Sequence, residues 1–283
     1  MSIAEKLFAN RWIAGSSSSD AIKLSKKLEL VNIHSMLNFL GEDLTNVLKV
    51  NETVNEYLSL ISQIKNEELT CSISIKPTQI GMLINDSELE KNYAKLAEKA
   101  RRSKIFLWLD MESYSHVDKT LSLYLNNLSD KNQYTGICIQ SYLKRSINDV
   151  KKIVKKEGKI RLVKGAYHED QLVSYTRYDS TINYLKIMQY LFERSNSFML
   201  ATHDLSIINK SLWLSKKYKK NPTYAMLYGI RNKLAVKLAL TNNMVLYLPY
   251  GKNWFSYSYR RLRESSNLTL VLRSLLENQR IGN

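Results

Sequence analysis

The sequence predicts an α/β protein built as a (β/α)8 barrel, with a short N-terminal helical arm and a C-terminal helix over the barrel mouth. Eight short apolar runs alternate with longer amphipathic segments, and the 283 residues suit a barrel, which needs roughly 250. The chain also lacks the G-x-G-x-x-G turn that a doubly wound, dinucleotide-binding sheet carries after an early strand. A doubly wound sheet stays the alternative architecture.

The apolar runs have the length and composition of buried strands. Because each is followed by a segment long enough for a helix, neighbouring strands are expected to pair in parallel. The expected strands are Leu30–Leu37, Cys71–Lys76, Ile105–Leu109, Thr135–Ile139, Ile160–Val163, Phe198–Thr202, Tyr224–Leu227 and Met244–Leu248.

The segments between the runs show the spacing of amphipathic helices. In residues 116–128 and again in 146–156, apolar side chains recur every three or four positions. Asp179-Ser180 and Asp204 are residue types that cap helix N-termini, so we expect helices to begin there.

No composition break divides the chain. It holds only three prolines and nine glycines, and no linker-like stretch separates two halves. We therefore expect one domain over residues 1–283, with residues 1–28 as the N-terminal arm. The two cysteines, Cys71 and Cys138, lie in apolar runs and are expected to be buried reduced thiols.

The N-terminus lacks a signal-peptide core, and no apolar run reaches the ~18 residues of a membrane span. These observations predict a cytoplasmic protein. The net charge is +16, and many lysines occur in pairs. Solvated helix faces explain such pairs, but a basic surface also attracts polyanions. Contact with the anionic inner face of the cell membrane is favoured over nucleic acid as the second explanation, and no nucleic-acid partner is expected.

Polar and ionisable residues stand at the end of nearly every expected strand. The carboxyl ends of barrel strands meet at one mouth, so these side chains should converge there. This many of them predict a site for a large polar ligand, although each alone also fits a helix cap or a loop hydrogen bond. The residues are Lys76, Asp110, Gln140, Arg161, Lys164, Gly165, Thr202, His203, Tyr228, Gly229 and Tyr247.

Residues 254–268 read as a helix that carries a cationic clamp. Tyr257, Arg260, Arg261 and Glu264 are spaced three or four residues apart and share one face. Two adjacent arginines beside a tyrosine suit a carboxylate or a phosphate, and the glutamate would orient the guanidinium groups. A basic exposed helix is the plainer interpretation.

These motifs occur in the order, and over almost the whole length, of one family. The sequence resembles proline dehydrogenase of the single-function microbial type. The motifs are "SIKPTQIG" (74–81), "LDMES" (109–113), "ICIQSYLKR" (137–145), "RLVKGAY" (161–167), "ATHD" (201–204), "AMLYGIR" (225–231), "YLPYG" (247–251) and "YSYRRLRE" (257–264).

The resemblance implies a barrel flavoprotein that oxidises L-proline to pyrroline-5-carboxylate. Hydride passes to FAD, and electrons then pass to a quinone acceptor. By matched position, Arg161 would lie near the redox nitrogen of the flavin ring as a catalytic cation, with Asp110 as the second catalytic residue. Gly165 would let the backbone approach the cofactor, because glycine has no Cβ.

The resemblance also implies the remaining contacts. The FAD contacts would be Met111, Gln140, Arg161, Val163, Lys164, Gly165, Ala166, Thr202 and His203. The proline carboxylate would be held by Lys76, Arg260 and Arg261, the pocket would be completed by Asp110, Leu227, Tyr247 and Tyr257, and Glu264 would orient the arginine pair. No metal is expected, and the oligomeric state stays open.

Two other functions remain as alternatives. A metal-dependent barrel hydrolase would use His168, His203 and Asp110, although no two histidines have the i, i+4 spacing of a helical metal site. A basic binding protein without catalysis would explain the net charge alone.

Overall fold

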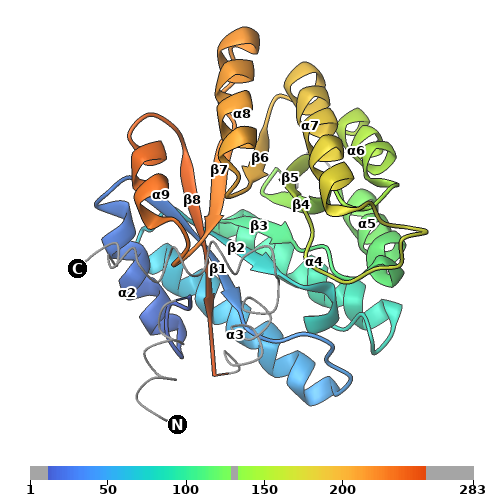
Figure 1. The fold of residues 1–283 in the computed structure, drawn as a ribbon. Coiled ribbons are helices and arrows are strands. Elements are labelled where there is room, and N and C mark those ends of the chain that lie inside the picture. Colours follow the sequence, from blue (N-terminus) through green and yellow to red (C-terminus); the bar gives the residue numbers. More distant parts are fainter. Residues whose placement is uncertain (1–11, 129–132, 253–283) are drawn as a thin grey trace, which may run out of the picture.

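Eight parallel strands close into a barrel in the computed structural model, which describes residues 12–128 and 133–252 (Figure 1). The strands follow one another in sequence order around the barrel, and β1 closes it by pairing with β8 along the full length of both strands. The strands are β1 Ile33–Phe39, β2 Cys71–Ile75, β3 Phe106–Leu109, β4 Thr135–Gln140, β5 Lys159–Val163, β6 Phe198–Ala201, β7 Thr223–Leu227 and β8 Met244–Tyr250. The predicted (β/α)8 architecture is confirmed, and the doubly wound alternative is wrong.

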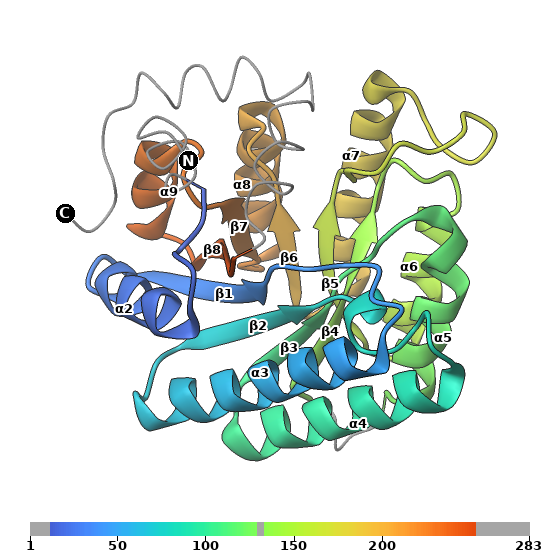
Figure 2. The same ribbon diagram turned by 90° about the horizontal axis from the view of Figure 1, so that it is seen from below.

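Helices surround the barrel, and seven of them each connect one strand to the next (Figure 2). The α-helices are α2 Ser18–Glu29, α3 Val47–Asn66, α4 Asp86–Ser103, α5 Val117–Asn126, α6 Ser146–Lys155, α7 Arg177–Arg194, α8 Leu205–Tyr218 and α9 Asn232–Ala239. Two 3₁₀ turns, η1 Pro77–Gln79 and η2 Tyr114–His116, follow β2 and β3 at the barrel mouth.

The helix α2 belongs to the barrel wall and does not project as an arm. It packs against β1 and β8, the two strands that close the barrel. The chain reaches α2 from the mouth, because the amide of Ala14 donates to the carbonyl of Pro249 and the amide of Gly251 donates to the carbonyl of Gly15. The described part of the predicted arm therefore seals the seam between the first and last strands.

Two sequence-based boundaries need correction. The first strand begins at Ile33 and not at Leu30, because Leu30 caps α2 and Asn32 turns the chain with a positive φ of 56°. The cap of α7 is Thr176 and not Asp179, whose carboxylate accepts a hydrogen bond from the Thr176 hydroxyl at 2.7 Å. The predicted cap Asp204 of α8 is confirmed.

The barrel separates two apolar cores. A large core fills the space between strands and helices, and it includes Cys71 and Cys138, both buried free thiols as expected. A small core fills the barrel interior with Met36, Trp108, Met199, Ala225 and Val245. Because this inner core closes the barrel below, inward-pointing polar groups gather above it, toward the carboxyl ends of the strands.

Among the described residues, none of the helices has both the length and the apolar character that crossing a bilayer requires.

Candidate active site

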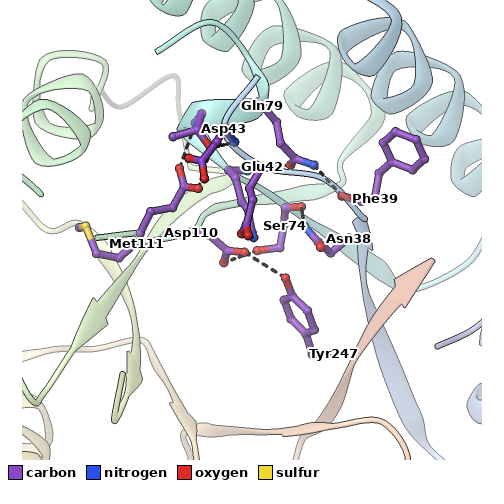
Figure 3. Close-up of polar contacts among 12 residues, drawn as sticks. Asn38, Phe39, Glu42, Asp43, Ser74, Gln79, Asp110, Met111 and Tyr247 are labelled. Atoms are coloured by element: carbon purple, nitrogen blue, oxygen red, sulfur yellow. Dashed lines mark hydrogen bonds and ion pairs between the residues drawn. The ribbon is translucent and has the colours of Figure 1, made fainter. Parts of the chain in front are cut away.

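A buried ion pair between β5 and β3 forms the centre of the site (Figure 3). The Arg161 guanidinium donates from Nη2 to Oδ1 of Asp110, the residue that follows β3. The hydroxyl of Ser74 on β2 donates to the same oxygen at 2.6 Å, and the hydroxyl of Tyr247 on β8 donates to Oδ2 at 3.0 Å. Four strands thus each place one polar group on a single carboxylate.

The Arg161 side chain is enclosed on every side that the described residues reach. Its Nη1 contacts the sulfur of Met36 and lies 3.3 Å from Oγ of Ser74. The rings of Trp108 and Tyr247 lie 5.6 and 5.7 Å from its Cζ, within range of cation–π attraction. Only 4% of Arg161 is exposed. A charge buried this deeply is tolerated because its carboxylate partner is fixed beside it.

Lys76 follows β2 and pairs with Glu42 of the β1–α3 loop. The Nζ to Oε2 distance is 2.5 Å. The backbone near Lys76 is fixed by the fully buried Gln79, whose Oε1 accepts hydrogen bonds from the Lys76 amide and the Tyr57 hydroxyl. The amide group of Gln79 donates to the carbonyl of Phe39 at 2.7 Å, which joins the ends of β1 and β2 (Figure 3). The predicted cation is therefore held rigidly at the mouth.

Glu112 is a buried carboxylate that the sequence reasoning did not single out. Its two oxygens accept hydrogen bonds from the amide of Thr78 at 2.9 Å and the hydroxyl of Thr78 at 2.7 Å. The Thr78 hydroxyl oxygen in turn accepts from the amide of Asp43 at 3.0 Å. Burial and the charge of Asp110 raise the pKa of Glu112, although Lys76 and the Thr78 hydrogen bonds oppose the change. Glu112 thus ties the loops after β1 and β2 to β3.

The raised pKa of Glu112 gives a stability prediction. A carboxyl group whose folded pKa is raised stabilises the fold most at low pH, and that contribution is lost from about pH 4.5 upward to the folded pKa. The wild type should therefore lose stability relative to Glu112→Gln as pH rises through this window, by about 1.4 kcal/mol for each pH unit that the window spans. Urea unfolding of both proteins at pH 4 and pH 8 measures it, and a pH-independent difference would contradict the raised pKa.

Gln140 at the end of β4 supports the loop after β3. Its Nε2 donates to the carbonyls of Met111 at 3.0 Å and Glu112 at 3.2 Å. Its Oε1 is buried and has no hydrogen-bond partner within the described ranges. Leaving a buried amide oxygen unpaired costs free energy, so this atom indicates a donor that a bound molecule supplies.

The end of β6 carries Thr202 and His203. The hydroxyl oxygen of Thr202 accepts a hydrogen bond from the amide of Asp204 at 3.1 Å. Nε2 of His203 accepts from the amide of Leu227 at 3.1 Å, and the His203 carbonyl accepts from Arg231 at 2.8 Å. Because Nε2 is an acceptor here, the imidazole proton resides on Nδ1. His203 therefore links the ends of β6 and β7 at the mouth.

Lys164 follows β5 and reaches toward α7 and α8. Its Nζ donates to Oγ1 of Thr181 and to Oδ2 of Asp204, both at 3.0 Å. Hydrogen bonds from Ser206 and Lys164 lower the pKa of Asp204 to about 2 against the opposing effect of burial. Lys164 is half-buried, and the neighbouring Val163, Gly165 and Ala166 range from half-buried to exposed. The predicted cofactor residues of this loop line the mouth beside the central cluster's strand.

Gly165 has a structural reason that differs from the predicted one. Its φ is +115°, and a Cβ at this position would lie 2.0 Å from Cδ1 of the Tyr142 ring. The glycine is therefore already required by the packing of Tyr142 over the β5–α7 loop, whether or not a cofactor approaches.

We expect Gly165→Ala to lower the free energy of unfolding by about 1–3 kcal/mol, because alanine is strained at this φ and collides with an aromatic ring. Chemical denaturation measures the change. A matched Tyr142→Ala/Gly165→Ala variant removes the collision but keeps the backbone strain, so it should show a smaller penalty for the glycine substitution than the single variant. An unchanged unfolding free energy in Gly165→Ala would contradict the described packing.

Four predicted residues, Tyr257, Arg260, Arg261 and Glu264, lie outside the described residues. Within the described ranges, no group of three His, Cys, Asp or Glu side chains is placed to hold a metal ion. His168, His203 and Asp110 are all described, so the structure contradicts the alternative in which they form a metal centre of a hydrolase.

The sequence held a signal for some of the residues that were missed. In "CSISIK", the polar residues alternate with isoleucine, so Ser72, Ser74 and Lys76 share the face that points into the barrel. Ser74 could have been found this way. Glu42 had no such signal, because its pairing with Lys76 joins positions 34 residues apart.

A closed parallel barrel with a buried charge cluster at the carboxyl ends of its strands defines a barrel enzyme. The family model described as "Proline dehydrogenase" matches residues 21–273. The chain belongs to the proline dehydrogenase family, and it is accordingly an enzyme that oxidises proline in proline catabolism.

Relatives of similar length agree with this assignment. The chain is 30% identical over 278 residues to "Proline dehydrogenase 1" of Bacillus subtilis, covering 96% of this chain and 92% of that protein. It is 32% identical over 279 residues to "Proline dehydrogenase" of Deinococcus radiodurans, covering 95% and 90%.

Solved structures show the same fold. Proline utilization A from Bdellovibrio bacteriovorus, inactivated by N-propargylglycine, matches with a TM-score of 0.87 at 22% identity over 97% of this chain. Proline utilization A from Corynebacterium freiburgense matches with a TM-score of 0.80 at 20% identity over 98% of this chain. The chain spans about a third of each of those longer proteins, 34% and 33%.

Proposed function

We propose that the chain oxidises L-proline to pyrroline-5-carboxylate with FAD as its cofactor and delivers the electrons to a quinone. The family supplies the substrate class. The observation that carries the proposal is the Arg161–Asp110 pair with Ser74 and Tyr247, which puts a fixed cation and a polar carboxylate at the barrel mouth beside Lys76.

The substrate anion needs a cation that is positioned but not permanently neutralised. Lys76 meets this requirement, because its ammonium is about one-sixth exposed and its partner Glu42 belongs to a loop. Exchange of Glu42 for the proline carboxylate would keep Lys76 paired throughout. Tyr247 and Leu227 would border the ring of the substrate, and Arg260 and Arg261 would add to the carboxylate clamp with Tyr257 and Glu264 beside them.

The residues at the ends of β3 to β6 fit a flavin. The unpaired Oε1 of Gln140 suits an N–H donor such as the ring imide of an isoalloxazine. The cations Arg161 and Lys164 suit a cofactor that bears phosphates and gains negative charge on reduction. Met111, Val163, Gly165, Ala166, Thr202 and His203 complete the set expected to hold it.

When bound, FAD would supply the acceptor for the hydride that leaves the proline ring carbon next to nitrogen. The chain contributes position and electrostatics. Arg161 cannot move away, since Asp110, Ser74 and two aromatic rings fix it, so its charge needs no reorganisation when the reaction occurs. Asp110, held by the Tyr247 hydroxyl, would face the ammonium end of proline while Lys76 faces the carboxylate.

The test uses the full chain, loaded with FAD and supplied with a soluble dye as electron acceptor. Mass spectrometry should show L-proline converted to a product lighter by two hydrogens, with one dye equivalent reduced by two electrons for each proline. Formation of no such product by protein that retains bound flavin would contradict the proposed reaction. Activity with the dye but none with a quinone would contradict only the acceptor.

A further inference from the structure

The positive charge of the chain is concentrated in one part of the barrel. Residues 205–252 contain no Asp or Glu and nine Lys or Arg residues, so this stretch carries +9 of the net +16. The stretch includes α8, β7, α9 and β8, which lie next to one another around the barrel. The residues are Lys210, Lys216, Lys217, Lys219, Lys220, Arg231, Lys233, Lys237 and Lys252.

One face of α8 combines this charge with an exposed aromatic ring. Lys210, Trp213, Lys216 and Lys217 are spaced three, three and one residues apart and lie on the outer face, which we name the α8 patch. Trp213 is 51% exposed. The ammonium groups of Lys210 and Lys217 lie 4.1 and 5.4 Å from the centroid of its ring. A half-exposed tryptophan between two cations contributes nothing to the buried core.

The lysines of the patch lack a compensating anion. Within the described residues, no carboxylate forms an ion pair with Lys210, Lys216 or Lys217. The nearby Glu193 of α7 feels the charge of Lys217, but its carboxylate accepts hydrogen bonds from Gln189 and Tyr218 instead. The α8 patch is therefore an uncompensated cationic surface with an apolar ring at its centre.

This combination matches the chemistry of a bilayer surface. Indole rings prefer the boundary between headgroups and acyl chains, and lysines can reach anionic headgroups while their stems lie along apolar surface. A polybasic surface gains about tenfold in membrane affinity for every one to two lysines near anionic lipid. The patch is the outer face of a helix (Figure 1), whereas helices that read nucleic acid insert into a groove.

We propose that the α8 patch docks the chain on an anionic lipid bilayer, with Trp213 at the interface and the three lysines on headgroup phosphates. The surface carries the inference by itself. Its purpose rests on the proposed function, because a quinone acceptor is dissolved in the membrane and the enzyme has to meet it there.

The test is flotation of the full-length FAD-loaded protein with two kinds of vesicle, neutral phosphatidylcholine and phosphatidylcholine mixed with phosphatidylglycerol. The wild type should float only with the anionic vesicles. Lys210→Glu/Lys216→Glu/Lys217→Glu should weaken this binding by at least about 100-fold. Its matched control, Lys151→Glu/Lys152→Glu/Lys155→Glu on the exposed face of α6, makes the same charge change elsewhere and should bind much more tightly than the patch variant.

The aromatic part of the patch has its own control. Trp213→Ser should weaken flotation several-fold, whereas Tyr178→Ser, which removes a ring that is 75% exposed on α7, should not. Equal losses in the patch and control variants, flotation with neutral vesicles alone, or binding to a DNA duplex but to no vesicle would overturn the proposal. Proline oxidation with a soluble dye, measured in the same variants, should be unchanged, so a failure of docking is distinguishable from a failure of the proposed reaction.

Discussion

Arg161→Met should lower kcat for proline oxidation with a soluble acceptor by at least about 100-fold. The guanidinium is a preorganised cation held by Asp110 and by Ser74, and removing one such group from an active site typically costs this much. Stopped-flow and steady-state kinetics on FAD-loaded protein measure the effect. Arg102→Met is the matched control, because Arg102 is an exposed arginine on α4, and its kcat should equal that of the wild type.

Loss of folding has to be separated from loss of catalysis in this variant. Removing one partner of a buried ion pair costs about 3–5 kcal/mol, because the remaining charge is left uncompensated. Arg161→Met/Asp110→Asn removes both charges and should therefore regain much of the lost stability in chemical denaturation. Its kcat should stay low. A double variant that is stable and also fully active would contradict the role given to Arg161.

Lys76→Met should raise KM for proline by about 100-fold, with a smaller change in kcat. Truncating one partner of a buried, hydrogen-bonded charge pair costs about 2–5 kcal/mol, and here the lost partner of Lys76 is the substrate carboxylate. Steady-state kinetics over a wide range of proline concentration separates the two parameters. Lys91→Met removes an exposed lysine that pairs with Glu88 on α4 and should leave KM unchanged.

Glu42 sharpens this prediction. In the described structure it occupies the Nζ of Lys76, so it competes with the substrate carboxylate for the same ammonium. Glu42→Gln removes that competitor and should lower KM. If Lys76→Met left KM within about twofold of the wild type, the carboxylate would be held by other residues and the position of Lys76 would be structural.

Much of the site was predictable because strand ends in a parallel barrel meet at one mouth. Asp110 after "IFLWL" and Arg161 within "KIRLV" are charged residues in otherwise apolar runs, and the structure joins them directly. Tyr247 could be placed the same way, since residues that alternate along β8 point alternately into the barrel and toward the helices.

The rest depended on tertiary pairing that no local pattern reveals. Leu30 and Val31 read as the start of a strand because they are apolar, yet the chain is still leaving α2 there and Leu30 is 86% exposed. The place of α2 between β1 and β8 follows from closure of the barrel and not from its own sequence. Glu112 follows Asp110 by two positions, but its role required knowing that Thr78 folds against it.

The most direct measurement is an anaerobic titration of the FAD-loaded protein with L-proline, followed by the visible absorbance of the flavin. If the cations of the barrel mouth hold the cofactor and the amino acid together, the absorbance of the wild type should bleach in full. The stable Arg161→Met/Asp110→Asn variant should bleach at least about 100-fold more slowly. An unchanged wild-type spectrum, or equal bleaching rates in the two proteins, would contradict the account.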